Sequence, residues 1–421
     1  MAPRRAPRNS FELFVAALRR LARSSGPSRA MQIAFLLLLA TTARAEKSIL
    51  HTSWWPPGTE KNSESVGVKS GELIYATGMM ERNFSSNATW TPAGLAQELR
   101  DVGDIFQNAS ANLSNLVSCL VNAPTTKGAA GAVNAALHAI GKKSGLKLTA
   151  VTMVPMQGEF GGWFGVQLSC LASTAPLAKR FATTVTSPSG LTNVTAVAAG
   201  PLVHLSVEEF VYDGVDIINV ELLSAVENAM YTVGAYASWN GLLECTAFVN
   251  TEQDAKALRQ GLIAAALPAA APAITTLVLL DQSATAPTDG LRLRLRCTGL
   301  VTPGPKTAVT LPNAPSVRAV VSASTGHVFV SGIDAKSANA TDAYETLGAV
   351  LTKAGSTADL ATKCHFYLRD YASMQGMYAG FYSYFNEQHF PPPARTEFTR
   401  VASDACADCP MVVQCDAALR R

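Results

Sequence analysis

The segment from Cys364 to Phe385, CHFYLRDYASMQGMYAGFYSYF, contains two kinds of hydrophobic pattern in succession. It opens with an apolar and aromatic run of the length of a strand. Apolar residues then recur at i, i+4, i+7 and i+11, at Met374, Tyr378, Phe381 and Phe385. This spacing places one apolar stripe on a helix. The segment therefore predicts a core strand followed by an amphipathic helix.

Cysteine spacing indicates that this segment belongs to the last of three copies of one unit. Cys119, Cys245 and Cys364 are 126 and 119 residues apart. A second cysteine follows each of them after 51 or 52 residues, at Cys170, Cys297 and Cys415. Self-similarity at a nearly fixed period is the sequence signature of tandem structural repeats.

Two further signals recur in register with the cysteines. An amphipathic helix is expected before each first cysteine, with these apolar stripes: Leu95, Leu99, Val102 and Phe106; Leu222, Val226, Ala229 and Val233; Ala340, Tyr344, Leu347 and Leu351. Before each helix lies a strand-like run opened by glycine: Gly71 to Gly78, Gly200 to Val207, and Gly326 to Gly332. The alternative, coincidence in an Ala-rich chain, does not explain why three signals agree.

The repeated unit predicts an α+β fold with the order β-β-α-β-α-β-β and helices on one face of a mixed sheet. We expect a targeting segment at 1–45 and repeats at 46–173, 178–300 and 314–421. The linkers are the stretch from Ser173 to Leu177 and the Pro-rich stretch from Thr302 to Pro315.

The first 45 residues have the composition of a targeting sequence. Residues 1–30 contain seven arginines against one acid, and the apolar run from Ile33 to Ala40 and the small-x-small motif Ala43-Arg44-Ala45 follow. These features favour the secretory pathway. The Arg-rich amphipathic start keeps a mitochondrion or plastid as the alternative. Six Asn-x-Ser/Thr acceptors agree with secretion and glycosylation: Asn83, Asn87, Asn108, Asn112, Asn193 and Asn339.

Overall composition excludes two classes of partner. The net charge is only +3 and no basic stripe follows the leader, so nucleic-acid binding has no support. No run of about 18 apolar residues is present, so we expect no membrane-spanning helix in the mature protein.

The third repeat resembles the RidA/YjgF family of imine deaminases, also described as endoribonuclease L-PSP-like. Cys364 to Asp370 matches the family's central strand and Ala372 to Phe385 its second helix. Pro393-Ala394-Arg395-Thr396 is similar to its Pro-Ala-Arg-Ser signature, and Val413 to Ala418 resembles its closing strand. Family members form trimers with a chorismate-mutase-like fold and a pocket at each interface. The resemblance implies that three linked copies form an intramolecular pseudo-trimer, which removes the need for self-association.

The family reaction is hydrolysis of a 2-imino acid to a 2-oxo acid and ammonia. By resemblance, Arg395 would clamp the substrate carboxylate through two parallel hydrogen bonds. Asp416 would transfer the proton, and a register shifted by two residues would give this place to Gln414. We expect the substrate-binding residues Arg395, Ser331, Gly332 and Gln375, with no cofactor and no metal.

The other two repeats depart from this pattern. Ile274 takes the arginine position in repeat two, and Leu148 takes it in repeat one. Ser169 and Arg296 stand where a carboxylate is expected. In repeat three itself, Glu397 lies two residues from Arg395 on the same strand face and could neutralise the clamp.

The cysteines allow two disulfide hypotheses. The first is a small loop disulfide at Cys406-x-x-Cys409, since no second pair or histidine cluster favours zinc there. The second is one disulfide within each repeat, between the cysteines 51 or 52 residues apart. Buried free thiols on core strands are the alternative.

Three functions follow as hypotheses: an imine or enamine deaminase with one site, a non-catalytic scaffold or small-carboxylate-binding protein, and, more weakly, a ribonuclease. Hydrolysis of iminopyruvate separates the first two.

Overall fold

The computed structural model describes residues 47–53, 57–58, 65–80, 91–124, 129–143, 150–156, 166–187, 190–211, 220–265, 271–280, 291–399 and 401–420. These residues all belong to one compact unit, residues 45–421. The predicted leader, Leu148 and the acceptors Asn83 and Asn87 lie outside the described residues. Secretion and glycosylation therefore stay predictions.

The elements of the third repeat include those expected around Cys364 and one strand, at residues 306–311, in the stretch that was expected to be a linker. They are β13 (Lys306–Leu311), β14 (Ala314–Ser322), β15 (His327–Val330), β16 (Ile333–Ala335), α7 (Thr341–Lys353), β17 (Ala361–Leu368), α8 (Ser373–Phe381), β18 (Ala394–Thr399), β19 (Val401–Ser403) and β20 (Met411–Ala418). The sheet order is β13-β14-β15-β20-β17-β18, and β16 also pairs with β20. Only β17 and β18 run parallel among these neighbours.

The first two repeats have the same plan. Repeat one contains β1 (Lys47–Ile49), β2 (Gly67–Ser70), β3 (Leu73–Met80), α3 (Pro92–Asn108), β4 (Leu116–Pro124), α4 (Ala129–Lys143), β5 (Ala150–Met156) and β6 (Gln167–Ser173). Repeat two contains β7 (Leu177–Ser187), β8 (Gly190–Ala199), β9 (Leu202–Val211), α5 (Val220–Thr232), β10 (Leu242–Val249), α6 (Glu252–Ala265), β11 (Ala273–Leu279) and β12 (Leu291–Leu300). The orders β1-β2-β3-β6-β4-β5 and β7-β8-β9-β12-β10-β11 match that of repeat three. The predicted α+β repeats are thus confirmed, with at least three strands before the first helix of each repeat in place of the expected two.

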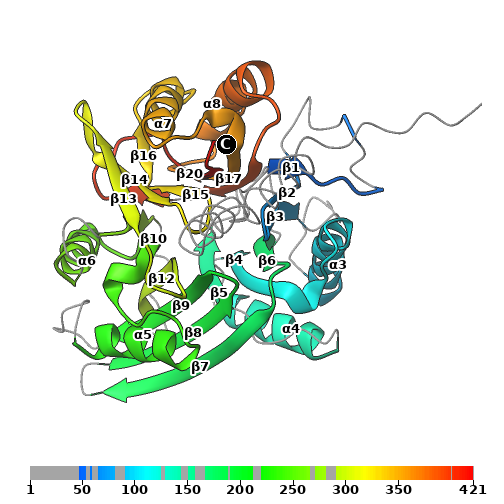
Figure 1. Ribbon diagram of the computed structural model, residues 1–421, viewed down its shortest axis with the longest axis vertical. Coiled ribbons are helices and arrows are strands. Elements are labelled where there is room, and N and C mark those ends of the chain that lie inside the picture. Colours follow the sequence, from blue (N-terminus) through cyan, green and yellow to red (C-terminus); the bar gives the residue numbers. More distant parts are fainter. Residues whose placement is uncertain are drawn as a thin grey trace, which may run out of the picture. The chain divides into compact units, whose positions relative to one another are not determined.

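Each sheet buries one face under its own two helices. The predicted stripes on α3, α5 and α7 are buried in three separate cores, one in each repeat. Figure 1 shows the helix pairs α3/α4, α5/α6 and α7/α8 on the outside, with the sheets toward the middle of the unit. The inner sheet faces share further apolar clusters, one of which joins Leu120, Phe248 and Tyr367 from the three repeats.

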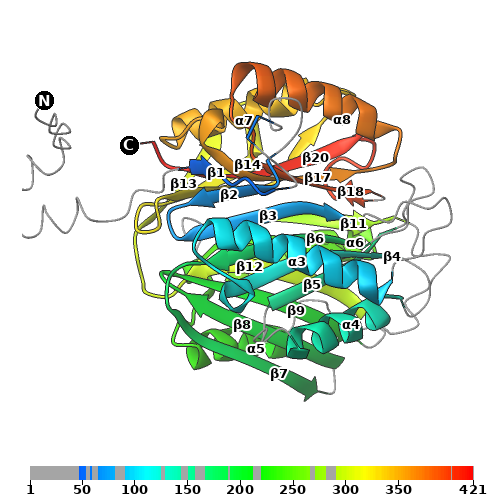
Figure 2. The ribbon, with the colours of Figure 1, turned by 90° about the vertical axis from the view of Figure 1, so that its right-hand side faces the viewer.

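The repeats contact one another in cyclic order. β5 packs on β9, β11 packs on β14, and β18 packs on β3, so each repeat presents its parallel edge strand to the next one. Figure 2 shows the strands of the three sheets stacked between the helix layers. β19 leaves the sheet of repeat three and pairs antiparallel with β11 of repeat two. The predicted intramolecular arrangement of three tandem units is therefore observed.

All eight cysteines lie in the described residues and all are paired. Three cross-strand disulfides join Cys119 to Cys170, Cys245 to Cys297, and Cys364 to Cys415. A fourth joins Cys406 to Cys409. The three long-range pairs join directly opposite residues of antiparallel strands, which brings the cysteines of each repeat together.

No helix among the described residues is long and apolar enough to span a membrane.

Candidate functional site

Arg395 lies on β18 between the sheet and the helices of repeat three. Its side chain is 4% exposed, and its Nε pairs with the carboxylate of Glu397. The guanidinium carbon lies 4.6 Å from the ring centre of Tyr378 and 4.7 Å from that of Phe381. A guanidinium over an aromatic face gains a cation–π attraction, which is stronger where water is excluded. Arg395 is therefore bound on two sides within its own repeat.

Side chains alternate between the two faces of β18, and this alternation explains why Arg395 points toward the helices of its own repeat. Ala394 and Phe398 belong to the apolar clusters on the inner side of the sheets, so Arg395 and Glu397 point the other way, toward α8. The sequence-based expectation that Glu397 shares a strand face with Arg395 agrees with this geometry.

The edge of β18 adjoins repeat one. The Ser65 amide donates to the Pro393 carbonyl at 3.4 Å, and the Ser65 hydroxyl donates to the Pro392 carbonyl at 2.8 Å. Ser65 and Ala394 also form an isolated parallel bridge. Repeat one is thus the neighbour of the strand that carries Arg395, a choice that the sequence left open.

Ser331 and Gly332 lie at a different interface. The Ser331 hydroxyl accepts a hydrogen bond from the Arg318 amide at 2.9 Å, and the Gly332 amide donates to the Thr275 hydroxyl of repeat two at 2.7 Å. A Cβ at Gly332 would come within 2.8 Å of the Thr275 Cγ2, so only glycine fits this close approach. Gln375 is exposed on α8. Ser331 and Gly332 thus lie at the interface with repeat two, whereas Gln375 lies on α8, the helix whose Tyr378 covers Arg395.

Asp416 faces the interior of the pseudo-trimer. Its carboxylate pairs with the Lys363 ammonium at 2.7 Å, and both side chains are almost fully buried. In the sheet, Lys363 is opposite Asp416, whereas the next residue, Cys364, is opposite Arg395. Arg395 and Asp416 therefore lie on opposite faces of one sheet. The single pocket expected to contain both is corrected to two separate environments, and the role of each residue stays a prediction.

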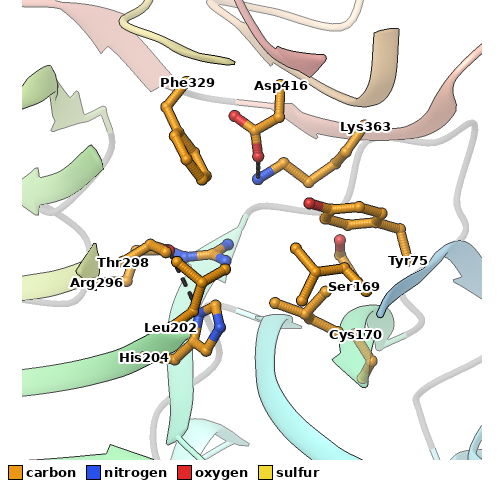
Figure 3. Close-up of a pocket in the computed structure, with 12 residues that line it drawn as sticks. Tyr75, Ser169, Cys170, Leu202, His204, Arg296, Thr298, Phe329, Lys363 and Asp416 are labelled. Carbon is orange, nitrogen blue, oxygen red and sulfur yellow. Dashed lines mark hydrogen bonds and ion pairs between the residues drawn. The ribbon is translucent and has the colours of Figure 1, made fainter. Parts of the chain in front are cut away.

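Side chains from all three repeats meet around Asp416 in a central chamber (Figure 3). Its lining residues are Leu73, Tyr75, Ser169, Cys170, Leu171, Leu202, His204, Arg296, Thr298, Phe329, Lys363 and Asp416. The cavity measures about 10 Å³, room for about one water molecule. Asp416 Oδ1 and His204 Nε2 have no hydrogen-bond partner within the described part of the chain.

A hydrogen-bond network continues from the chamber into repeat two. Lys363 lies 4.0 Å from the Glu244 carboxylate, which accepts a hydrogen bond from the Gln414 amide at 2.5 Å. The Gln414 carbonyl accepts from the Tyr367 hydroxyl at 2.9 Å and from the Thr246 hydroxyl at 3.2 Å. Gln414, the alternative proton-transfer residue, thus shares the inner face with Asp416.

Burial shifts the pKa values of this network. It raises the pKa of Glu244 to about 7, and the negative charge of Asp416 adds to the shift. Burial, with the positive charges of Arg296 and Lys363, lowers the pKa of His204 to about 3. His204 is therefore neutral at physiological pH, and Glu244 exchanges a proton near neutrality.

Sequence reasoning missed Lys363 and Glu244 as members of a site. A signal was present, because each immediately precedes a cysteine that a core strand carries. On a strand, a neighbour of a helix-facing residue points to the opposite face, where the three repeats meet. Among the described residues, no group of three or more His, Cys, Asp or Glu side chains could hold a metal ion.

No family model and no curated protein sequence matches the chain. Solved structures match it in segments of one repeat. NMB1025 of the YjgF family from Neisseria meningitidis is 20% identical over 28% of this chain and 97% of its own, with a TM-score of 0.24. The E. coli YjgF gene product is 15% identical over 30% and 98%, with a TM-score of 0.23. E. coli TdcF with bound serine is 10% identical over 30% and 99%, with a TM-score of 0.24.

The observed strand order recurs three times in the chain, and each of these structures covers about one recurrence. In segments of about one repeat, the chain is similar to solved structures that include members of the YjgF family.

Proposed function

We propose that this chain is a non-catalytic RidA-like scaffold, in which the third repeat no longer hydrolyses 2-imino acids. One observation carries the proposal: the Arg395 guanidinium is buried, paired with Glu397 and covered by two aromatic rings. A carboxylate clamp must offer its N–H groups to the substrate. In this chain the carboxylate of Glu397, on the same strand, already pairs with Arg395.

Competition for Arg395 favours Glu397 over a dissolved substrate. Glu397 lies two residues away on a paired strand, so its association with Arg395 costs no translational freedom. A 2-imino acid would have to displace this carboxylate and leave it buried without its counter-ion. Removing one partner of a buried ion pair costs about 3–5 kcal/mol.

The central chamber does not supply a substitute substrate site. A cavity of about 10 Å³ is far below the roughly 300–1,000 Å³ of sites that enclose small-molecule ligands. The other arginine position within the described residues is Ile274, which cannot hold a carboxylate. Neither place supports imine hydrolysis.

The second candidate is imine hydrolysis at Arg395, beside repeat one. The observation that favours it is the retention of this arginine on β18, the strand that packs on β3. The chain would then bind a small carboxylate after Glu397 swings away.

Hydrolysis of iminopyruvate generated in situ separates the two candidates. We expect the purified chain and its Arg395→Ala variant to release pyruvate no faster than the reaction without protein. Faster release by the wild-type chain, lost in Arg395→Ala, would establish the deaminase and overturn the scaffold proposal.

A further inference from the structure

The fourth disulfide differs from the other three in its exposure. Cys406 is partly exposed, in the segment between β19 and β20, and Cys409 is 4% exposed. The six cysteines of the cross-strand disulfides are all buried. Thiol–disulfide exchange requires a thiolate to reach a sulfur atom, so accessibility decides which disulfide reacts. Cys406 is the more exposed residue of this disulfide, so we take its sulfur as the one attacked.

The same chain contains two internal comparisons for this segment. The equivalent connections, residues 157–166 between β5 and β6 and residues 280–290 between β11 and β12, contain no cysteine. Both repeats nevertheless have the strand order of repeat three. The Cys406–Cys409 disulfide is therefore not needed for the repeat fold.

The residues just before Cys406 fasten repeat three to repeat two. β19 pairs with β11 in the register of Leu277 with Ser403. The Asp404 carboxylate then accepts two hydrogen bonds from Arg259 on α6, at 3.0 Å from Nε and 2.6 Å from Nη2. We call residues 401–404 the clasp. Because the two hydrogen bonds to the buried Asp404 carboxylate are parallel, they require one orientation of the clasp relative to α6.

We propose that Cys406–Cys409 is a site of reversible thiol modification by a dithiol reductant, and that opening it loosens the clasp. A thiolate of the dithiol attacks Cys406 Sγ, the S–S bond breaks, and Cys409 Sγ leaves as a thiolate that takes a proton. The second thiol of the reductant then displaces Cys406 from the mixed disulfide. Two electrons reach the chain, and the reductant becomes a disulfide.

The effect on the clasp follows from the short connection. Only residues 405–410 separate the clasp from β20, and the disulfide restrains four of them. Reducing the disulfide gives residues 405–410 more conformational freedom. We therefore expect the hydrogen bonds between β19 and β11 to break more often. The three buried disulfides keep each repeat intact during this change. The inference does not depend on the chemistry of Arg395.

Alkylation after brief treatment with dithiothreitol under native conditions tests the site. Mass spectrometry of peptides is expected to show labelled Cys406 and Cys409, with at least tenfold less label on the other six cysteines. Equal labelling of a cross-strand pair, or free thiols at Cys406 and Cys409 before reduction, would overturn the proposal.

Hydrogen exchange tests the clasp. Reduction should speed amide exchange in β19 and β11 and leave β17 unchanged. A Cys406→Ser/Cys409→Ser variant should exchange fast without reductant, and Asp404→Asn should match it with the disulfide intact. Asp408→Asn is the control, because Asp408 is exposed, pairs with Arg369 of repeat three rather than with repeat two, and lies outside the clasp. Unchanged exchange in β19 after full reduction of Cys406–Cys409 would contradict the coupling.

Discussion

The parallel edge strands of repeats two and three occupy the same position and carry opposite chemistry. On β11, Ile274 is opposite Cys245 and is 7% exposed in the helix-side core of repeat two. On β18, Arg395 is opposite Cys364 and is 4% exposed. Two residues later, Thr276 in repeat two corresponds to Glu397 in repeat three. The position that Ile274 and Arg395 share lies in the core of a repeat. A charged side chain at this position therefore needs a partner of opposite charge inside the fold.

A second difference concerns the residue before each first cysteine. Glu244 in repeat two and Lys363 in repeat three are equivalent, have opposite charges and lie 4.0 Å apart. Three identical repeats would bring three like charges together at this place. Because the repeats differ at this position, a buried polar network can form across them. The repeats are then no longer interchangeable.

The largest expected effect comes from breaking the ion pair of repeat three. Glu397→Ala should lower the free energy of unfolding by about 3–5 kcal/mol, because Arg395 is left buried without its carboxylate. Thr276→Ala is the matched change in repeat two and should cost about 1 kcal/mol. Urea unfolding of both variants measures the difference. Equal losses would show that the buried charge is not what distinguishes the strands.

The next effect is a pH dependence that belongs to Glu244. Its folded pKa of about 7 lies above its ordinary value of about 4.5, so the folded state binds more protons between these values. The free energy of unfolding therefore falls as pH rises through this window, by on the order of 3 kcal/mol. The contribution is fully present below about pH 4.5 and lost above about 7.

Glu244→Gln isolates this contribution from the charges that face it, Lys363, Asp416 and Arg296. The difference in unfolding free energy between wild type and variant should change between pH 4.5 and 7, with wild type losing stability relative to the variant. A difference that is flat across this range would refute the raised pKa.

A smaller effect is expected when repeat three receives the residues of repeat two. The double variant Arg395→Ile/Glu397→Thr replaces a buried ion pair by residues that the equivalent strand already accommodates. Such replacements are often neutral or stabilising, so we expect unfolding free energy within about 1 kcal/mol of wild type or higher. Thermal unfolding measures it, and a loss as large as that of Glu397→Ala would show that the pair itself stabilises the repeat.

The smallest effect concerns Gln375. Its side chain is exposed on α8, so Gln375→Ala should change unfolding free energy by less than about 0.5 kcal/mol. Added to Glu397→Gln, where we expect pyruvate to bind, it should also leave that binding unchanged. A measurable loss of binding would return Gln375 to the site that the sequence suggested.

Much of the fold could be predicted because it depends on local patterns. The spacing of the cysteines located the repeats, and apolar periodicity located the buried stripes of α3, α5 and α7. The pairing hypothesis for Cys364 and Cys415 agrees with the structure because equal spacing reflects one strand pair repeated three times.

The candidate site was harder to predict. Alternation along β20 indicated that Gln414 and Asp416 share a face. Alternation could not show that Asp416 and Arg395 lie on opposite faces of the sheet, because their relation depends on the register between strands. Burial of Lys363 beside Asp416 also depends on neighbouring repeats. The ion pair between Arg395 and Glu397 could be predicted, since both residues lie on one strand.

Calorimetric titration of pyruvate into wild type, Glu397→Gln and Glu397→Ala tests the closed clamp most directly. We expect no binding heat with wild type, and saturable binding once the competing charge is removed, in whichever variants retain the wild-type circular dichroism spectrum. Added Arg395→Ala should abolish that binding. Saturable binding of pyruvate by the wild-type chain, lost in Arg395→Ala, would contradict the claim that Glu397 closes this site.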